Sequence, residues 1–310
     1  MTTPRHTKTL IYLLIGTLLL TTLACNLTGQ SDQGSNTEQL ELELAATQLA
    51  IELTQQALAE PQQAQEQPTQ PVPTSEVPDV VPQTAPNVSY EGISFYRDPA
   101  LAGTVDMATI PEEQGVADAP LWTANPTYYL FSFGSYQPQG TFHQPELYIY
   151  PLADFIDLAP EIAGMAYDLQ QILAAKSSDP GEIPFLPFFN AAQFFQAQVA
   201  YLDFQSGSGV RFLTMYGQAA WPVDNYSLFY TFQGITSDQK YYVSAIFPVN
   251  HPNLPDDGNE IVGEDWIGFD ENFPTYLEDT VVQLNSYSAD SFTPDLTQLD
   301  ALIQSIQIDR

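Results

Sequence analysis

Seven prolines between residues 61 and 86 divide this chain into two parts that cannot share a helix or a strand. Each proline lacks the backbone N–H donor and fixes φ, and a series of them favours an extended, polyproline-II-like chain. We therefore predict a Pro-rich disordered linker over residues 61–87 and a fold that lies after it. The prolines are Pro61, Pro68, Pro71, Pro73, Pro78, Pro82 and Pro86.

An apolar run follows two basic residues near the N-terminus. Arg5 and Lys8 precede residues 10–20, which read LIYLLIGTLLL. A positive region followed by a short apolar run is typical of a secretory signal peptide. A membrane-spanning helix needs about 20 apolar residues, so an uncleaved anchor is the weaker alternative. We predict that residues 1–24 are a lipoprotein-type signal peptide.

The single cysteine of the chain follows this run. The segment Thr22-Leu23-Ala24-Cys25 resembles the lipobox of bacterial lipoprotein precursors, in which a small residue precedes a cysteine that becomes acylated after cleavage. A lone cysteine cannot form an internal disulfide, which favours another role for it. The resemblance implies that Cys25 is lipidated with palmitate-type chains and that the protein is anchored to the cell membrane in an extracytoplasmic location.

Residues 25–60 are predicted to form a tether and a stalk helix. From residue 37 to residue 60 the chain is rich in Gln, Glu, Ala and Leu and contains no Gly or Pro, which favours helix. Heptad spacing places Leu40, Leu44, Ile51 and Leu58 on one seam, with threonines at the two remaining positions. The seam permits self-association, but a solvated single helix is the simpler alternative, so the oligomeric state stays open.

The charge balance excludes several partners. After residue 24 the chain has five Lys and Arg against 38 Asp and Glu, a formal charge of −33. Nucleic-acid affinity comes largely from Lys and Arg that displace counterions from phosphates, so nucleic acid is excluded as a partner. Anionic lipid headgroups are repelled for the same reason, which leaves a covalent anchor as the predicted attachment to the membrane.

Residues 88–310 are predicted to form a single globular domain of the α+β class, with a mainly antiparallel sheet and flanking helices. Strand-like stretches and turns follow one another without a regular βαβ repeat. Helices are expected where apolar residues recur at intervals of three and four. The predicted strands are 89–96, 128–133, 146–151, 198–204, 210–216, 228–234, 241–249 and 307–309, and the predicted helices are 160–176, 274–284 and 294–305.

The domain has two family resemblances. The order of its elements, with the sequence GISF at residues 92–95 and a helix and a strand at the end, resembles PsbP- and Mog1-like domains. The segments GVRFLT (209–214), YTFQG (230–234) and YYVSAIFPV (241–249) resemble the core of uncharacterised bacterial envelope lipoproteins. These resemblances imply a fold and a cell-envelope location, and they imply no catalytic residue.

The sequence contains no motif for a particular reaction. Cys25 is committed to the anchor, the hydrolase elbow G-x-S-x-G does not occur, and no paired-histidine zinc spacing exists. His143 and His251 are the histidines of the globular domain, and each lies near a proline, which is typical of loop histidines. We predict no catalytic residue and no cofactor.

An acidic segment near residue 260 is a candidate calcium site, because Ca²⁺ prefers clustered carboxylates. Residues 253–264 have the wrong residue types at several positions of an EF-hand loop, so only an irregular site comes into question. A solvated acidic loop is the alternative. The candidate ligands are Asp256, Asp257, Glu260, Glu264 and Asp265.

The aromatic residues give a hypothesis for binding. Most of them alternate as core residues do, whereas Trp221 and Trp266 are candidates for stacking on sugar rings. We predict a non-enzymatic binding or envelope-interaction module whose partner is an envelope protein or a cell-wall glycan. The alternative is an extracellular glycan hydrolase with an Asp/Glu pair. A two-lobed solute receptor fits less well, because the sequence has no doubled α/β pattern.

Overall fold

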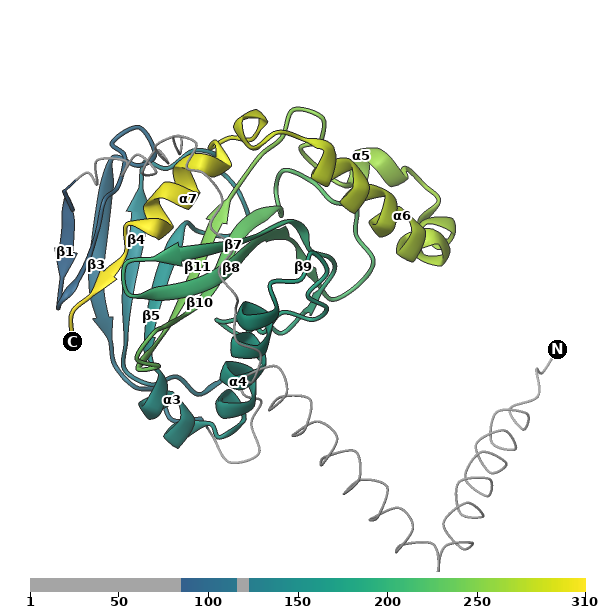
Figure 1. Ribbon diagram of the computed structural model, residues 1–310. Coiled ribbons are helices and arrows are strands. Elements are labelled where there is room, and N and C mark those ends of the chain that lie inside the picture. Colours follow the sequence, from purple (N-terminus) through teal and green to yellow (C-terminus); the bar gives the residue numbers. More distant parts are fainter. Residues whose placement is uncertain (1–84, 116–122) are drawn as a thin grey trace, which may run out of the picture. The chain divides into compact units, whose positions relative to one another are not determined.

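The computed structural model describes residues 85–115 and 123–310 (Figure 1). The predicted signal peptide, Cys25, the predicted stalk and residues 61–84 of the predicted linker lie outside the described residues. None of the helices in the described part of the chain is long and apolar enough to cross a membrane.

A seven-stranded antiparallel sheet forms the centre of the described region, with strand order β3-β4-β5-β11-β10-β8-β7. Helices cover both of its faces, so the predicted α+β class with a mainly antiparallel sheet is confirmed. The strands are β3 (Thr104–Ile110), β4 (Tyr128–Gly134), β5 (Glu146–Pro151), β7 (Ala197–Phe204), β8 (Gly207–Thr214), β10 (Phe229–Thr236) and β11 (Tyr241–Pro248). Two small sheets accompany it, formed by β1 (Val88–Tyr90), β2 (Ile93–Phe95) and β12 (Gln307–Ile308), and by β6 (Ala192–Gln193) and β9 (Tyr216–Gly217).

The predicted strands 198–204, 210–216, 228–234 and 241–249 are confirmed, and they pair as two hairpins, β7–β8 and β10–β11. All eight residues of β10 are buried, because this strand has neighbours on both sides and is covered on both faces. Gly209 lies outside the predicted strand 210–216 but within β8. A Cβ at Gly209 would lie 2.2 Å from Cζ of Phe232, so the ring of Phe232 occupies the space that any other residue would need.

One face of the sheet is covered by α6 (Trp266–Ser286), α7 (Leu296–Gln304) and the three-stranded sheet. Asp295 caps α7, because its side chain accepts a hydrogen bond of 2.8 Å from the Thr297 amide. A bulge in β7 places Gln198 at φ 55°, and its side-chain amide donates bonds of 2.8 Å to the carbonyls of Leu284 and Tyr287. The C-terminal end of α6 is thereby held against the edge of the sheet.

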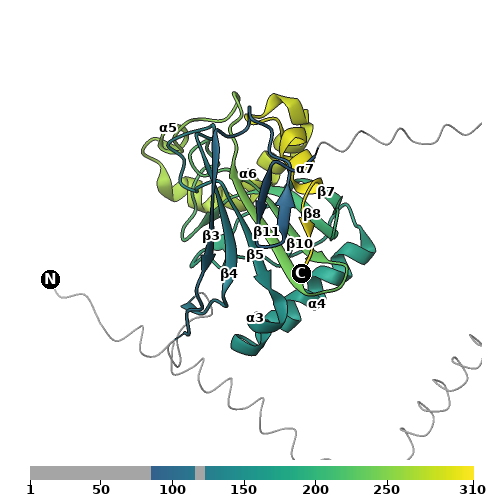
Figure 2. The ribbon, with the colours of Figure 1, turned by 90° about the vertical axis from the view of Figure 1, so that its left-hand side faces the viewer.

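The other face is covered by α3 (Leu152–Leu158), α4 (Glu161–Ala175) and the segment 183–189. The predicted helix 160–176 is confirmed as α4, which buries Ile162, Ala166 and Leu169 and ends where Lys176 turns left-handed with φ 46°. In Figures 1 and 2, α3 and α4 lie together at the bottom, whereas α6 and α7 lie at the top. Two shorter helical segments are α5 (Asn259–Val262) and η3 (Ala289–Ser291).

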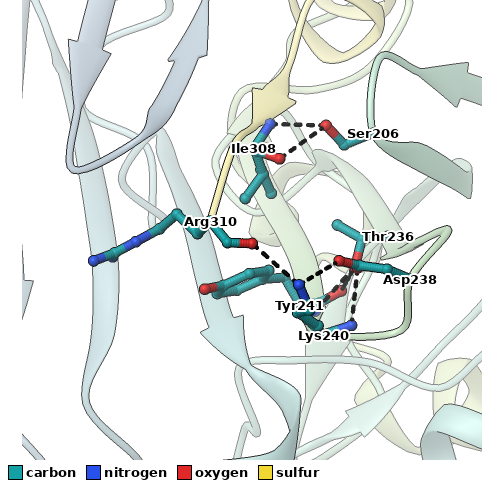
Figure 3. A network of polar contacts seen from close by, with 7 residues as sticks. All are labelled: Ser206, Thr236, Asp238, Lys240, Tyr241, Ile308 and Arg310. Carbon is teal, nitrogen blue, oxygen red and sulfur yellow. Dashed lines mark hydrogen bonds and ion pairs between the residues drawn. The ribbon is translucent and has the colours of Figure 1, made fainter.

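Polar contacts tie the last strand to the central sheet (Figure 3). The Ile308 amide donates to Oγ of Ser206 over 2.8 Å, and Nζ of Lys240 donates to the carbonyl of Arg310 over 3.2 Å. On the same face, Nε of Arg211 in β8 pairs with Oδ1 of Asp300 in α7 over 3.2 Å. The predicted terminal strand is therefore confirmed.

Three sequence expectations were wrong in detail. The predicted strand 89–96 is the hairpin β1–β2, because Glu91 and Gly92 turn the chain with φ values of 48° and 73°. Helix α6 begins at Trp266 rather than at Pro274 and continues through that proline, whose side chain is exposed. The last helix was predicted to begin at residue 294, but α7 begins at Leu296 and Asp295 caps it. Strand β3 and helix α3 were not predicted.

Candidate functional site

Two cavities share the side chain of Tyr216 in their walls. The β6–β9 pair positions this residue, and Nε2 of Gln193 donates a hydrogen bond of 2.9 Å to its hydroxyl. A Cβ at Gly217 would lie 2.3 Å from Cζ of Phe194, so the close approach of that ring requires glycine. Burial raises the pKa of the Tyr216 hydroxyl, which stays protonated at neutral pH.

The larger cavity has a volume of about 940 Å³ and lies between α4, the segment 179–189 and residues 191–196. Aromatic rings and hydrogen-bonding side chains line it together, and its lining contains no Lys or Arg. The aromatic members are Phe185, Phe188, Phe189, Phe194, Phe195 and Tyr216, and the polar members are Asp168, Asp179, Glu182, Gln193 and Gln196.

Three rings of the larger cavity pack against one another. The ring centroids of Phe185 and Phe189 lie 4.8 Å and 5.0 Å from that of Tyr216, and 5.3 Å from each other. Aromatic pairs at these separations in tilted or edge-to-face arrangements are favourable beyond their buried area. The three rings form a preorganised wall, which we call the ring triad.

A buried amide holds the segment that carries two of these rings. Gln233 lies on β10, and its Oε1 accepts hydrogen bonds from the Leu186 amide over 3.0 Å and from the Tyr242 hydroxyl over 2.9 Å. Its Nε2 donates to the Leu186 carbonyl over 3.1 Å. The segment 183–189 is proline-rich and does not pair with a strand. The bonds from Gln233 therefore satisfy backbone groups that would otherwise be buried without a hydrogen-bond partner.

The smaller cavity has a volume of about 520 Å³ and combines exposed aromatic rings with carboxylates. Phe142 is 63% exposed and Tyr226 is 48% exposed. Their ring centroids lie 6.0 Å apart in an edge-to-face arrangement, and the Phe142 amide donates to the Tyr226 carbonyl over 2.8 Å. Other residues in the wall are Met215, Tyr216, Trp221, Asp224, Asp256 and Asp257.

Asp224 fixes the shape of the smaller cavity. Its carboxylate is 1% exposed and accepts hydrogen bonds from Nε1 of Trp221 over 3.0 Å, from the Ser227 amide over 2.9 Å and from the Gly258 amide over 2.9 Å. A Cβ at Gly258 would lie 2.7 Å from Nε1 of Trp221, so glycine permits this close packing. Three donors satisfy the buried charge without any cation.

Three cations of the described residues form ion pairs outside the cavities. Arg211 pairs with Asp300, Lys240 with Asp238 over 3.1 Å, and Arg310 with Glu91 over 3.5 Å. No Lys or Arg of the described part of the chain lines either cavity. Both cavities are therefore suited to neutral or cationic ligands and repel anions.

The structure brings Trp221 and Trp266 together. Their ring centroids lie 5.2 Å apart with an interplanar angle of 30°, so each indole covers one face of the other. Both side chains are half-buried, and Trp221 lines the smaller cavity whereas Trp266 lines neither. Trp221 therefore belongs to a cavity wall, and Trp266 supports it from behind.

The five acidic residues of the predicted calcium site are not assembled into a coordination shell. Within residues 85–115 and 123–310, no group of three or more His, Cys, Asp and Glu side chains is arranged to hold a metal ion. Asp256 accepts from Nδ2 of Asn225 over 3.2 Å, Asp257 from the Asn259 amide over 2.9 Å, and Asp265 caps α6. Glu260 and Glu264 are exposed. Calcium binding stays a prediction.

The two histidines are placed differently from typical loop histidines. His143 packs against the rings of Phe142, Phe189 and Phe229 at centroid distances of 4.9, 5.0 and 4.4 Å, and burial lowers its pKa to about 4. It is therefore neutral at pH 7 and supports aromatic residues of both cavities.

His251 was expected in an exposed loop and is instead 2% exposed, stacked on Tyr287 at 3.6 Å. Its Nε2 lies 3.1 Å from Oγ of Ser291, which resembles a serine–base pair. However, its Nδ1 accepts a hydrogen bond from the Asn253 amide over 3.2 Å. The proton of the neutral ring therefore lies on Nε2, which donates to Ser291 and cannot act as its base.

Sequence reasoning missed Phe142, Tyr216 and Tyr226 as site residues. Neither Phe142 nor Tyr226 lies in a helix or a strand. Exposed aromatic residues in irregular segments are therefore the signal that was available, since a loop ring without a packing role is a candidate for binding.

No protein-family model, no curated protein and no solved structure matches the chain. The function must therefore be inferred from the cavities and from the N-terminal sequence.

Proposed function

We propose that this protein is an extracytoplasmic lipoprotein, anchored to the bacterial cell membrane through lipidated Cys25, and that its described domain is a non-enzymatic binding module. The lipobox-like segment Thr22-Leu23-Ala24-Cys25 supports the anchor, and acyl chains contribute about 0.8 kcal/mol per buried methylene to membrane attachment. The larger cavity with its ring triad is the observation that supports binding.

The ligand of the larger cavity is a neutral glycan of the cell envelope. Small-molecule sites have volumes of about 300–1,000 Å³, whereas protein partners require broad surfaces of about 800 Å² on each side. Exposed faces of aromatic rings stack on the C–H faces of sugars, and carboxylates and amides bond sugar hydroxyls. Phe188, Glu182 and Gln196 are placed to supply such contacts, since all three line the cavity and none is fully buried.

The geometry gives no specific support to glycan hydrolysis. A glycosidase needs a general acid whose pKa is raised, opposite a second carboxylate across the cleft. Burial raises the pKa of Asp300, but this residue contacts Arg211 and Tyr230 and lines neither cavity. Its environment is that of a structural ion pair.

Calorimetric titration with N-acetylglucosamine oligomers, which are neutral, tests the binding proposal. Phe188→Leu removes a lining ring and should weaken binding about fivefold, the equivalent of about 1 kcal/mol. Tyr167→Leu is the matched control, because Tyr167 lies on α4, is 59% exposed and does not line the cavity.

Three results would contradict this proposal. If no glycan binds, the proposed ligand is wrong. If Phe188→Leu and Tyr167→Leu lose the same affinity for glycan, the larger cavity is not the binding site. Release of reducing sugar by the wild type, measured in the same samples, would show a hydrolase instead of a binding module.

Metabolic labelling with a palmitate analogue tests the anchor. The wild type should be labelled and should sediment with membranes, whereas Cys25→Ser should carry no label and should be released or remain unprocessed. Label on the Cys25→Ser variant, or label on neither protein, would show that Cys25 is not the lipidated residue.

A further inference from the structure

The smaller cavity exposes two aromatic rings at the protein surface. Phe142 is more than half exposed and Tyr226 nearly half exposed, and their ring centroids lie 6.0 Å apart in an edge-to-face arrangement. Large apolar side chains that are exposed side by side mark interaction sites more often than structural ones. The Phe142 amide and the Tyr226 carbonyl are joined by a hydrogen bond, so the two rings are held in place from their backbones.

The same cavity carries negative charge that no cation neutralises. Asp256 and Asp257 each accept hydrogen bonds at Oδ1, which leaves Oδ2 of each without a partner among the described residues. The buried carboxylate of Asp224 lies in the same wall and has N–H donors but no ion pair. Charge so placed in a partly enclosed site favours a positively charged ligand.

We propose that the smaller cavity binds an organic ammonium ion, with Phe142, Tyr226 and Trp221 contacting its alkyl groups and Asp256 and Asp257 balancing its charge. A cation that lies over aromatic faces is attracted by the ring quadrupoles, and quaternary ammonium groups are the ligands that aromatic cages recognise. The volume of about 520 Å³ is within the range of small-molecule sites.

Other ligand classes fit less well. An anion would meet three carboxylates and no Lys or Arg. A metal ion would need several oxygen or nitrogen ligands converging on one point, and the described residues offer no such group. A neutral apolar molecule would use the rings but would gain nothing from the carboxylates.

Choline and its neutral carbon isostere 3,3-dimethyl-1-butanol are the matched probes. They have nearly the same shape and differ in the charge at the branched centre, so a comparison isolates the contribution of the cation. Isothermal titration of the full-length protein should give saturable binding of choline and at least tenfold weaker binding of the isostere. Binding of choline should also weaken as NaCl rises, because salt screens its attraction to exposed carboxylates.

Variants then assign the site. The double substitution Phe142→Leu, Tyr226→Leu should weaken choline binding about tenfold, since two cation–π contacts are lost. Phe142 is 63% exposed and Tyr226 48% exposed, so the melting temperature should change little. Tyr167→Leu is the control for an exposed ring outside the cavity.

The proposal is overturned if choline does not bind, if the neutral isostere binds equally well, or if the double variant binds choline as tightly as Tyr167→Leu does. It is independent of the glycan proposal, because Phe142 and Tyr226 do not line the larger cavity. Glycan titration of the double variant should therefore match the wild type, which separates failure of one proposal from failure of the other.

Discussion

Replacing Gln233 with methionine removes the buried amide that holds the wall of the larger cavity. Gln233 is completely buried, and its two polar atoms contact Leu186, Tyr242, Thr231 and Ser244. Methionine has a similar length and fills the same space, so packing is largely kept. The change in stability therefore reports the lost hydrogen bonds rather than the creation of a cavity.

The structure identifies which partners lose their bonds. The Leu186 carbonyl keeps a donor in the Ser244 hydroxyl, and the Tyr242 hydroxyl keeps an acceptor in the Pro184 carbonyl at 3.3 Å. The Thr231 hydroxyl keeps the Ala245 carbonyl at 2.8 Å. The Leu186 amide has no second acceptor among the described residues. One unsatisfied buried N–H costs about 1–3 kcal/mol, and the weaker hydrogen bonding of the other partners adds about 1 kcal/mol. The free energy of unfolding should therefore fall by about 2–4 kcal/mol.

Urea unfolding followed by tryptophan fluorescence measures this change. Gln304→Met is the matched control, because Gln304 is exposed on α7 and its side chain makes no hydrogen bond within the described region. Amide hydrogen exchange at Leu186 should also become faster in Gln233→Met. A loss of stability below about 0.5 kcal/mol, or a loss equal to that of the control, would refute the view that this amide anchors the segment 183–189.

Three further predictions concern His143, Arg211 and Gly217. Burial lowers the pKa of His143 to about 4. Because the folded state favours the neutral ring, the stability present above pH 6.5 is lost as the pH falls towards 4. In urea titrations the wild type should therefore lose about 2–3 kcal/mol more than His143→Leu between pH 7.5 and pH 4.5. Arg211→Met leaves the carboxylate of Asp300 buried without its cation, so thermal unfolding should show a loss of about 3 kcal/mol, and an unchanged melting temperature would contradict a structural role for the pair. Gly217→Ala pushes a Cβ into the ring of Phe194, so glycan affinity and stability should fall together, the latter by about 1–3 kcal/mol in calorimetry.

The central hairpins and the last helix could be predicted because their residues carry the pattern locally. In β10 and β11, runs of β-branched and aromatic residues are bounded by turn residues at both ends. In α7, the apolar residues recur at helical spacing and lie against the sheet. Local propensity and burial agree in these elements, so the sequence alone is sufficient to predict them.

Helix α6 shows why other elements were missed. Pro274 suggested a helix start, but a proline inside a helix is tolerated where the lost hydrogen bond faces solvent, and both Pro274 and Asp270 are exposed. Four aromatic residues of the N-terminal half contact one another in sequence, with centroid distances of 5.6–6.3 Å between neighbours. Their spacing of three and four residues indicates a helix face that continues through the proline. These residues are Trp266, Phe269, Phe273 and Tyr276.

The cavities could not be predicted, because their walls come from segments that only the tertiary structure brings together. Phe142 precedes β5, whereas Tyr226 precedes β10, and a single backbone hydrogen bond brings the two loops side by side. Tyr216 reads as the end of a strand in the sequence, and its position between two cavities depends on the pairing of β9 with β6. Trp221 was recognised by residue type, but its partner Asp224 was not.

The distribution of cations implies that ligand charge and ligand identity would be controlled by different residues at the two proposed sites. Arg211, Lys240 and Arg310 have structural partners, Nη1 of Arg97 donates to the Ala102 carbonyl, and Lys176 lies at the C-terminal end of α4, where the helix dipole favours a cation. The described surface around both cavities is therefore acidic, and many carboxylates contribute to the field. Loss of either Asp256 or Asp257 leaves the other carboxylate in the smaller cavity, whereas loss of one ring removes a contact that nothing replaces. Ring substitutions should accordingly change affinity more than single carboxylate substitutions, and the rings are where selectivity between ligands of the same charge must arise.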